Sequence, residues 1–377
     1  MSELPGLRPA WAEVDLDAVR ANVAALTELA APAALLAVVK ADGYGHGAVP
    51  AARAALEAGA SWLGVALVEE GITLRNAGIE APILVLSEPP RAAADAVVAH
   101  GLTPTVYTAV GIEGLAKAVA DAGASTPLGV HLKVDTGMHR VGCSTDDAPD
   151  LVEAIAARPE LTLDGLCTHL AVADEPDNPY TGQQLDRFDD LLRALDARDA
   201  RPRLVHAANS AGLLVHPRAR YDLVRAGIAL YGVAPAPELV GRLPLRPVLS
   251  LRARVSYVKQ LPAGSRMSYG LRYELERASS VATVPIGYAD GVPRNLGIAG
   301  GEVLVRGRRA RIAGTITMDQ LMIDVADAEV AVGDEVVLLG AQGDDEITAG
   351  EWADHLGTIA YEIVTGIGTR VPRRYTG

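Results

Sequence analysis

One lysine stands where an apolar segment of the sequence ends. In LLAVVKADGYGHG, residues 35–47, Lys40 follows five apolar residues and precedes a loop with three glycines and one tyrosine. Partial burial among apolar neighbours lowers the pKa of an amine, so that more of it is neutral and nucleophilic. Lys40 is therefore suited to Schiff-base chemistry with a carbonyl compound.

Other polar residues also follow apolar segments further along the chain. They are Lys133, Asp135 and Arg140 after 128–135, His169 in 163–170, His206, Asn209 and Ser210 after 202–209, and Arg225 and Gly227 in 221–228. A polar residue at the end of a single strand usually only faces water. Agreement among five segments, with Lys40 as the first, predicts one shared active face.

The segments HAANSAG and RAGIALYG predict a phosphate site. Asn209 and Ser210 would start a helix, and Gly227 would allow a ligand to approach the backbone closely. A phosphorylated aldehyde, pyridoxal phosphate, therefore suits Lys40 better than an unphosphorylated carbonyl substrate. The sequence has no phosphate-binding G-x-x-x-x-G-K-[ST] and no H-E-x-x-H, so we expect no metal.

The elements that would position these residues alternate between apolar runs and alanine-rich amphipathic stretches. The expected strands are 35–40, 62–67, 82–87, 103–108, 128–135, 163–170, 202–209 and 221–228. Continuous apolar strands between helices indicate a parallel sheet covered on both faces. Eight such units favour a (β/α)8 TIM-like barrel, and no G-x-G-x-x-G follows the first strand to indicate a doubly wound sheet.

The pattern changes after Gly241 to β-branched, alternating segments that are separated by turn residues. We therefore predict a barrel domain over residues 12–241 and a mostly antiparallel β domain over 242–377, joined by residues 1–11.

Composition excludes several classes of protein. The chain of 377 residues is 49% hydrophobic and 21% charged, as in ordinary globular proteins. Its formal charge of −13 argues against nucleic-acid and anionic-membrane partners. We expect a cytoplasmic protein, because there is no signal-like or membrane-spanning segment and only two cysteines, Cys143 and Cys167.

The chain resembles the bacterial alanine racemases over essentially its whole length. The motifs that carry the resemblance are AVVKADGYGHG (37–47), HLKVDTGMHRVG (131–142), THLAVADE (168–175), HAANSAG (206–212) and VRAGIALYG (224–232), followed by MSYG (267–270), PIGYADG (285–291), GTITMDQLMID (314–324) and YEIVTGIGTRVPR (361–373). Thr317 departs from the pattern, because many members have a cysteine there.

The resemblance implies a role for each matching residue. Lys40 would hold pyridoxal 5'-phosphate and act as one base, and Tyr269 would be the base on the opposite face of the substrate. Tyr44, Ser210, Gly227, Ile228 and Tyr361 would bind the cofactor phosphate, and Arg225 would face the pyridine nitrogen with His169 and His206 nearby. Arg140 and Met318 would contact the carboxylate of alanine, and Tyr288 would line the entrance. The family also implies a homodimer in which the partner supplies Tyr269, Tyr288 and Met318.

These implied roles agree with the chemistry of racemisation. A proton must leave one face of a tetrahedral carbon and another must arrive on the opposite face, which two bases accomplish directly. A tyrosine loses its proton only near pH 10 unless a neighbour favours the phenolate, and His169 polarised by Arg225 would do so. Arginine at the pyridine nitrogen would keep the ring unprotonated, which we expect to restrain transamination and decarboxylation.

Lys133 has two interpretations. The resemblance suggests a lysine carbamylated by CO2, whose negative charge would hold Arg140 in a bidentate pair. The alternative is an unmodified lysine paired with a nearby carboxylate or with chloride. Cys143 and Cys167 are interpreted as small buried apolar residues.

Three other functions remain as alternatives to an alanine racemase that supplies D-alanine for peptidoglycan. A basic amino-acid decarboxylase of the barrel type would need an acid in place of Arg225. A racemase of broader specificity would need smaller residues than Tyr288, Tyr361 and Met318. A non-catalytic cofactor carrier would not need the second domain.

Overall fold

The computed structural model describes residues 7–377, which fold into two compact units. The barrel unit comprises Val19–Gly43 and Ala48–Leu245, and the β unit comprises Tyr44–Gly47, Arg246–Gly377 and the described part of Met1–Ala18. The roles assigned to the predicted ranges 12–241 and 242–377 stay a prediction.

Eight parallel strands form the barrel unit, and the predicted fold class is confirmed. They are β2 (Ala34–Val38), β3 (Trp62–Val65), β4 (Ile83–Val85), β5 (Thr103–Val106), β6 (Leu128–Lys133), β7 (Leu161–Cys167), β8 (Leu204–His206) and β9 (Leu223–Ala226). Their order is β8-β7-β6-β5-β4-β3-β2-β9. Backbone hydrogen bonds from Asp222 N to Val205 O and from Arg225 N to Ala208 O, both 3.0 Å, nearly close the ring between β8 and β9.

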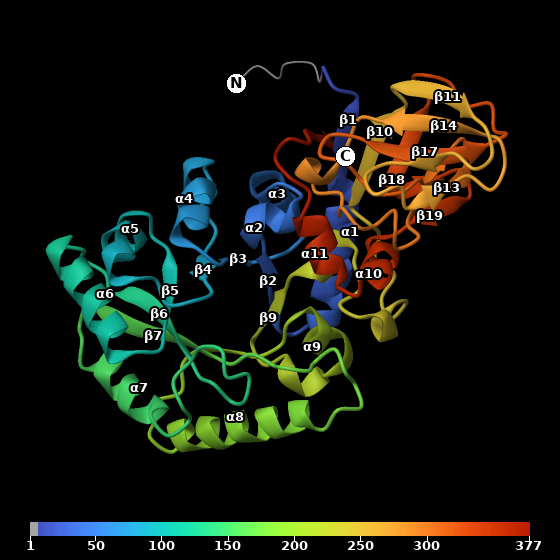
Figure 1. Ribbon diagram of the computed structural model, residues 1–377. Helices are drawn as coiled ribbons and strands as arrows, with labels where there is room; N and C mark the ends of the chain where they lie inside the picture. The colour runs from blue at the N-terminus through green and yellow to red at the C-terminus, as the bar shows by residue number, and fades with distance from the viewer. Residues whose placement is uncertain (1–6) are drawn as a thin grey trace. The chain divides into compact units, whose positions relative to one another are not determined.

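Helices alternate with these strands as the sequence predicts. They are α1 (Leu16–Ala30, which begins in the β unit), α2 (Lys40–Tyr44, which ends there), α3 (Ala48–Glu57), α4 (Val68–Asn76), α5 (Ala94–Ala99), α6 (Ala109–Asp121), α7 (Ala148–Ala156), α8 (Tyr180–Asp196) and α9 (Ser210–Val215). Figure 1 shows α5, α6 and α7 on the outer side of β5, β6 and β7. Gly59, Gly101 and Gly123 follow helices with positive φ, a backbone conformation that glycine adopts without steric cost.

The β unit contains a mostly antiparallel sheet in the order β11-β14-β17-β16-β15-β18-β10-β1-β20, with β19 paired to β18 and a separate β12-β13 pair. The strands are β1 (Ala10–Asp15), β10 (Leu249–Arg254), β11 (Tyr257–Leu261), β12 (Arg266–Met267), β13 (Tyr273–Glu274), β14 (Ser279–Val284), β15 (Glu302–Val305), β16 (Arg308–Ile312), β17 (Leu321–Ala326), β18 (Glu335–Gln342), β19 (Asp345–Ile347) and β20 (Arg373–Thr376); the helices are α10 (Ala349–Leu356) and α11 (Ala360–Thr365). Fully buried Trp352 of α10 lies in the apolar core of this unit.

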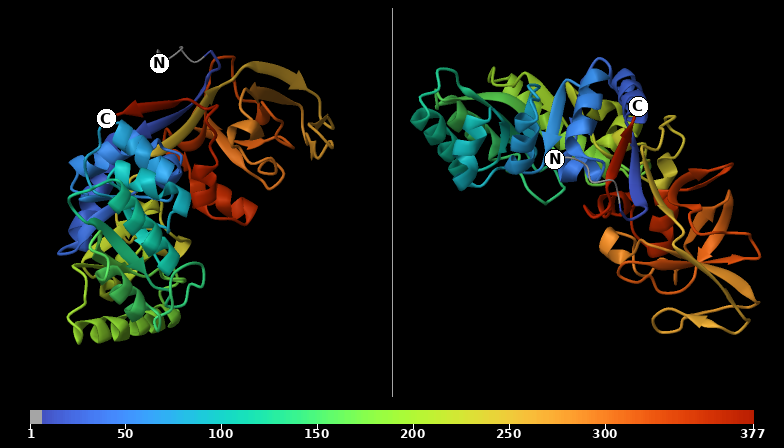
Figure 2. Two further views of the ribbon diagram at one scale, coloured as in Figure 1. Left: turned by 90° about the vertical axis from the view of Figure 1, so that its left-hand side faces the viewer. Right: turned by 90° about the horizontal axis from the view of Figure 1, so that it is seen from above.

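The two ends of the described chain meet in this sheet. Strand β1 pairs antiparallel with β10 and parallel with β20, and both views of Figure 2 show β1 and β20 side by side. Strand β1 starts at Ala10, within the range 1–11 that was expected to join the β domain, and continues to Asp15. Alternation of buried and partly exposed residues is weak in β1, so the sequence pattern does not mark where this strand ends.

Candidate active site

The predicted site residues are divided between the two units. The barrel unit holds Lys40, Lys133, Arg140, His169, His206, Ser210, Arg225, Gly227 and Ile228; the β unit holds Tyr44, Tyr269, Tyr288, Met318 and Tyr361.

Lys40 follows β2 at the carboxyl end of the barrel strands and is half-buried. Burial lowers the pKa of its amine, the nearby Arg140 lowers it further, and Glu70 opposes them by raising it. An amine with a lowered pKa is more often neutral at physiological pH and so is a better nucleophile and base. The prediction that Lys40 has a depressed pKa is therefore supported by its surroundings.

The backbone after Lys40, where the sequence indicates a loop, has a defined left-handed conformation. Ala41 (φ 51°, ψ 50°), Asp42 (φ 51°, ψ 49°) and Gly43 (φ 62°, ψ 43°) form a left-handed turn, in which Gly43 N donates to Val39 O at 2.9 Å. Left-handed backbone costs an L-residue about 1–2 kcal/mol. Glycine at 43 avoids this cost, but Ala41 and Asp42 do not, so other contacts must hold the turn.

Arg225, buried on β9, makes four hydrogen-bond contacts inside the barrel unit; three of them share the two hydrogens of its Nη2 atom. Its guanidinium contacts His206 Nδ1 at 2.7 Å, Thr168 O and Ala207 O both at 2.9 Å, and His169 Nδ1 at 3.3 Å. Because a guanidinium has no acceptor, both histidine Nδ1 atoms must accept. Neutral His169 and His206 therefore carry their hydrogen on Nε2. Burial, followed by Arg225, lowers the pKa of both histidines well below the usual value.

A third histidine, His131, extends this arrangement. His206 Nε2 and His131 Nδ1 lie 2.8 Å apart, so the Nε2 hydrogen of His206 donates to His131. Both side chains are fully buried, and burial lowers the pKa of His131 to about 3. His131 is not among the site residues predicted from the sequence. Its position two residues before Lys133 on the same strand was the available signal, since alternate strand residues share a face.

Ser210, Gly227 and Ile228 lie together where a phosphate was predicted. The buried Ser210 Oγ accepts from Gly227 N at 2.9 Å and from Ala229 N at 3.4 Å. Asn209 caps α9 by accepting from Gly212 N at 2.8 Å. The serine oxygen accepts two backbone N–H groups here, so its own O–H group can still donate to a ligand. The bond from Gly227 N to Ser210 Oγ connects the segment 206–212 to the segment 224–232.

Lys133 is buried on β6, and burial lowers the pKa of its amine; Arg225, Arg140 and Lys40 contribute in the same direction. No salt bridge to Lys133 occurs among residues 7–377. Asp135 does not pair with it: Asp135 Oδ1 accepts from Gly137 N at 2.9 Å and from His139 N at 3.0 Å. The carboxylate nearest in sequence therefore shapes the loop that leads to exposed Arg140.

In the β unit, Tyr44 and Tyr361 lie together, with ring centroids 6.3 Å apart and planes inclined by 54°. Tyr44 is buried, and burial raises its pKa to about 12. Near neutral pH its phenol therefore keeps its hydrogen and can donate it.

Tyr269, Tyr288 and Met318 are exposed in the single chain, by 68%, 39% and 52%. One segment, residues 315–318, holds all three in place. Thr315 Oγ1 donates to Tyr269 O at 2.9 Å, Tyr288 N donates to Thr317 O at 3.0 Å, and Ala289 N donates to Met318 O at 3.0 Å. The side chains stay exposed, while their backbones are fixed.

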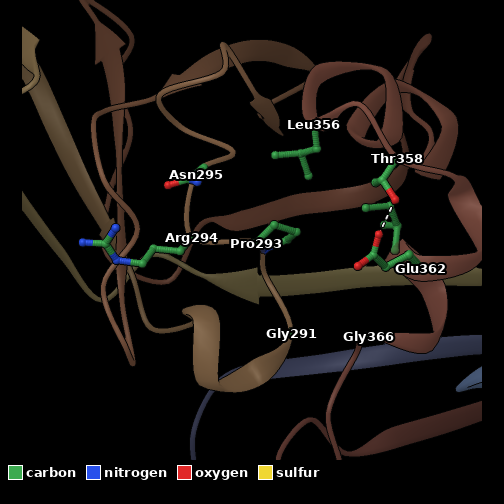
Figure 3. A pocket seen from close by; sticks show the side chains of 9 residues that line it. Gly291, Pro293, Arg294, Asn295, Leu356, Thr358, Glu362 and Gly366 are labelled. Atoms are coloured by element: carbon green, nitrogen blue, oxygen red, sulfur yellow. Dashed lines mark hydrogen bonds between the residues drawn. The ribbon is translucent and has the colours of Figure 1, made fainter.

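Other potential sites in the described residues are less informative. A surface pocket of about 360 Å³ in the β unit is lined by Gly291, Pro293, Arg294, Asn295, Leu356, Thr358, Glu362, Ile363 and Gly366 (Figure 3). None of the predicted site residues lines it. Within residues 7–377, no group of three or more His, Cys, Asp or Glu side chains is arranged to hold a metal, and no helix is long and apolar enough to cross a membrane.

Comparisons with known proteins agree with the resemblance noted in the sequence. Family models described as "Alanine racemase, N-terminal domain" and "Alanine racemase, C-terminal domain" match residues 14–235 and 248–375. The chain is 51% identical to the alanine racemase of Symbiobacterium thermophilum, covering 100% of this chain and 99% of that one. For the alanine racemase of Thermobifida fusca the identity is 47%, over 98% of each chain.

Solved structures of alanine racemases are also similar to this chain. The alanine racemase of D-cycloserine-producing Streptomyces lavendulae superposes with a TM-score of 0.93 at 44% identity, covering 100% of this chain and 98% of that one. The alanine racemase of Bacillus anthracis, solved with bound L-Ala-P, has a TM-score of 0.92 at 40% identity, covering 99% and 96%.

Proposed function

The chain belongs to the alanine racemase family and is an amino-acid isomerase that interconverts L- and D-alanine, and on this premise we propose that it does so with pyridoxal 5'-phosphate, using Lys40 and Tyr269 as bases on opposite faces of the substrate. In a bacterial cytoplasm the product D-alanine would serve peptidoglycan synthesis.

The observation that carries this proposal is a group of basic side chains at the carboxyl end of the barrel strands. Arg140 acts on the amine of Lys40, and Arg225, Arg140 and Lys40 act on that of Lys133, so that the pKa values of both lysines are lowered. Several basic side chains in a partly buried site, two of them always-charged arginines, favour anionic ligands. A phosphorylated cofactor and a substrate carboxylate supply such anions, and Lys40 supplies the amine that an aldehyde cofactor requires.

The residues fit this cofactor in their hydrogen-bonding capacity. Ser210 Oγ–H and the backbone around Gly227 and Ile228 would hold the phosphate, and the phenols of Tyr44 and Tyr361 would donate to it. Arg225 would face the ring nitrogen, with His169 and His206 fixing its guanidinium. When bound, pyridoxal phosphate supplies an electron-withdrawing ring that makes the substrate α-hydrogen acidic.

The two bases would divide the proton transfers between them. Lys40, with its lowered pKa, would accept or return the α-hydrogen on one face. The phenolic oxygen of Tyr269 would do so on the other, stabilised as phenolate by the N–H donor that His169 retains on Nε2. Arg140 and Met318 would hold the substrate carboxylate, and Tyr288 would narrow the entrance so that a small side chain is preferred.

Lys133 is expected to carry a carbamate. Burial lowers the pKa of the Lys133 amine and so increases its neutral fraction, which is the form that reacts with CO2, and the resulting anion would pair with Arg140. We predict a carbon-13 NMR carbamate signal from protein equilibrated with labelled bicarbonate. The signal should disappear in Lys133→Arg and persist in Lys117→Arg. If wild type gives no signal, or if Lys133→Arg retains the signal, Lys133 does not carry a carbamate.

The exposure of Tyr269, Tyr288 and Met318 supports a shared site in a homodimer. A base of the reaction should be shielded from bulk water, yet Tyr269 is 68% exposed in the single chain. In a twofold dimer, a second copy would receive these three side chains. The same arrangement would give each dimer two equivalent sites.

Co-expression of two inactive variants tests the shared site. If Lys40 comes from one chain and Tyr269 from the other, a hybrid of Lys40→Ala and Tyr269→Phe chains has one intact site out of two. Random pairing makes half of the dimers hybrid, so about a quarter of wild-type activity should return. The control pair, Lys40→Ala with Lys40→Arg, should recover none. If the first pair also recovers none, both bases would have to come from one chain.

A further inference from the structure

Glu70 contacts the left-handed turn that follows Lys40. It lies in the first turn of α4, in the barrel unit, and its Oε1 accepts from Ala41 N at 2.6 Å. The turn contains two non-glycine residues in left-handed backbone, Ala41 and Asp42. Such a conformation persists only where surrounding contacts hold it.

The second oxygen of Glu70 is occupied as well. Oε2 accepts from Ala66 N at 2.8 Å and from Leu67 N at 3.1 Å, the residues that lead from β3 into α4. Reaching back to these N–H groups is a usual capping role for a glutamate in this helix position. The bond to Ala41 is additional to that role, and it connects the end of β2 to the start of α4.

The pattern of donors requires an ionised carboxylate. Three backbone N–H groups converge on the two oxygens of Glu70, and only a carboxylate accepts at both oxygens. A glutamine in the same place would offer one oxygen and one NH2 group. It could satisfy either the cap of α4 or Ala41, and its NH2 group would face an N–H group at the other.

Glu70 also influences the charge of Lys40. Its carboxylate raises the pKa of the Lys40 amine, against burial and Arg140, which lower it. Lys133 faces the same region from β6, where Lys40 and Arg140 lower its pKa in turn. Of the two charged side chains that shift the pKa of Lys40, Arg140 and Glu70, only Glu70 is an anion.

We propose that Glu70 is a positioning residue for Lys40: by accepting the hydrogen bond of Ala41, it holds the strained turn and with it the backbone from which the catalytic amine extends. The inference rests on the proposed role of Lys40. Glu70 itself touches neither substrate nor cofactor in this account. Misplacement of a reacting group by even a small distance lowers the rate of the chemical step more than the binding of substrate.

Glu70→Gln in the full-length protein tests the inference, with Glu69→Gln as the matched control. Glu69 is the adjacent, exposed glutamate of α4, and its replacement removes the same charge. We expect hydrogen–deuterium exchange at the Ala41 amide to be at least about tenfold faster in Glu70→Gln than in the control. We also expect kcat for alanine racemisation to fall about tenfold or more, with KM within about twofold of wild type.

Three outcomes would overturn the inference: unchanged exchange at Ala41, faster exchange with kcat equal to that of Glu69→Gln, or a loss confined to KM. Glu70→Ala, which introduces no new N–H donor, gives the same comparison if the glutamine variant folds poorly. Exchange at Ala41 does not depend on which reaction Lys40 performs. A failure of the proposed function would therefore leave the exchange result intact and appear instead in the Lys40 variants.

Discussion

Lys40→Arg is expected to lower the rate of alanine racemisation at least about 10³-fold in both directions. Arginine keeps the positive charge and much of the length of the side chain, but it does not lose a proton near neutral pH. It can therefore act neither as a base nor as the amine that holds an aldehyde cofactor. Initial rates with L-alanine and with D-alanine, followed by polarimetry, measure the loss.

Lys117→Arg is the matched control for this prediction. Lys117 is exposed on α6, where it pairs with Asp121 one helical turn away. Its replacement should leave the rates within about twofold of wild type, because exposed ion pairs contribute little to stability. Racemisation by Lys40→Arg at a tenth of the wild-type rate or more would show that this amine is dispensable.

Tyr269→Phe is expected to lower racemisation about 10²-fold to 10⁴-fold while leaving the fold intact. The change removes one oxygen from a side chain that is 68% exposed in the single chain, so little packing is lost. The backbone bond from Thr315 Oγ1 to Tyr269 O does not involve the phenol and should persist. Rates in both directions, together with the thermal midpoint of unfolding, separate a catalytic loss from a structural one.

The control for the tyrosine is Tyr257→Phe. Tyr257 lies on β11 of the same unit and is 56% exposed, and no role in the reaction is proposed for it. Its rates should match wild type. Equal, small losses in the two variants would mean that the phenol of Tyr269 is not the second base.

The barrel could be predicted from the sequence because its signals are local. Each predicted strand is a run of buried apolar residues, and each of the eight contains an observed strand of the parallel sheet or overlaps one closely. Burial on both faces leaves such runs without polar alternation. Polar residues at or near the ends of these runs include Lys40 and Arg225. They could be placed at one end of the barrel, because the carboxyl ends of its parallel strands lie together.

Contacts between distant residues could not be predicted in this way. Three glycines in residues 43–47 indicated a loop after Lys40, yet Ala41 has left-handed backbone and its N–H group donates to a carboxylate 29 residues away. His131 meets His206 across 75 residues. A single sequence carries no signal for such pairs beyond the face of the strand on which each residue lies.

In the proposed homodimer, the second half of the site would come from a further copy of the chain. The side chains of Tyr269, Tyr288 and Met318 are exposed in the structure of one chain. Their proposed roles are inferred from the resemblance to alanine racemases. Their backbones are nevertheless joined through residues 315–318, which the sequence did not reveal.

The most direct test of the two-base account is exchange of the substrate α-hydrogen with deuterated solvent, measured separately from L- and D-alanine by proton NMR. If the two bases act on opposite faces, Lys40→Arg should lose exchange from one enantiomer and Tyr269→Phe from the other, while both lose racemisation. Loss of exchange from the same enantiomer in both variants, or undiminished exchange from both enantiomers in Tyr269→Phe, would contradict it.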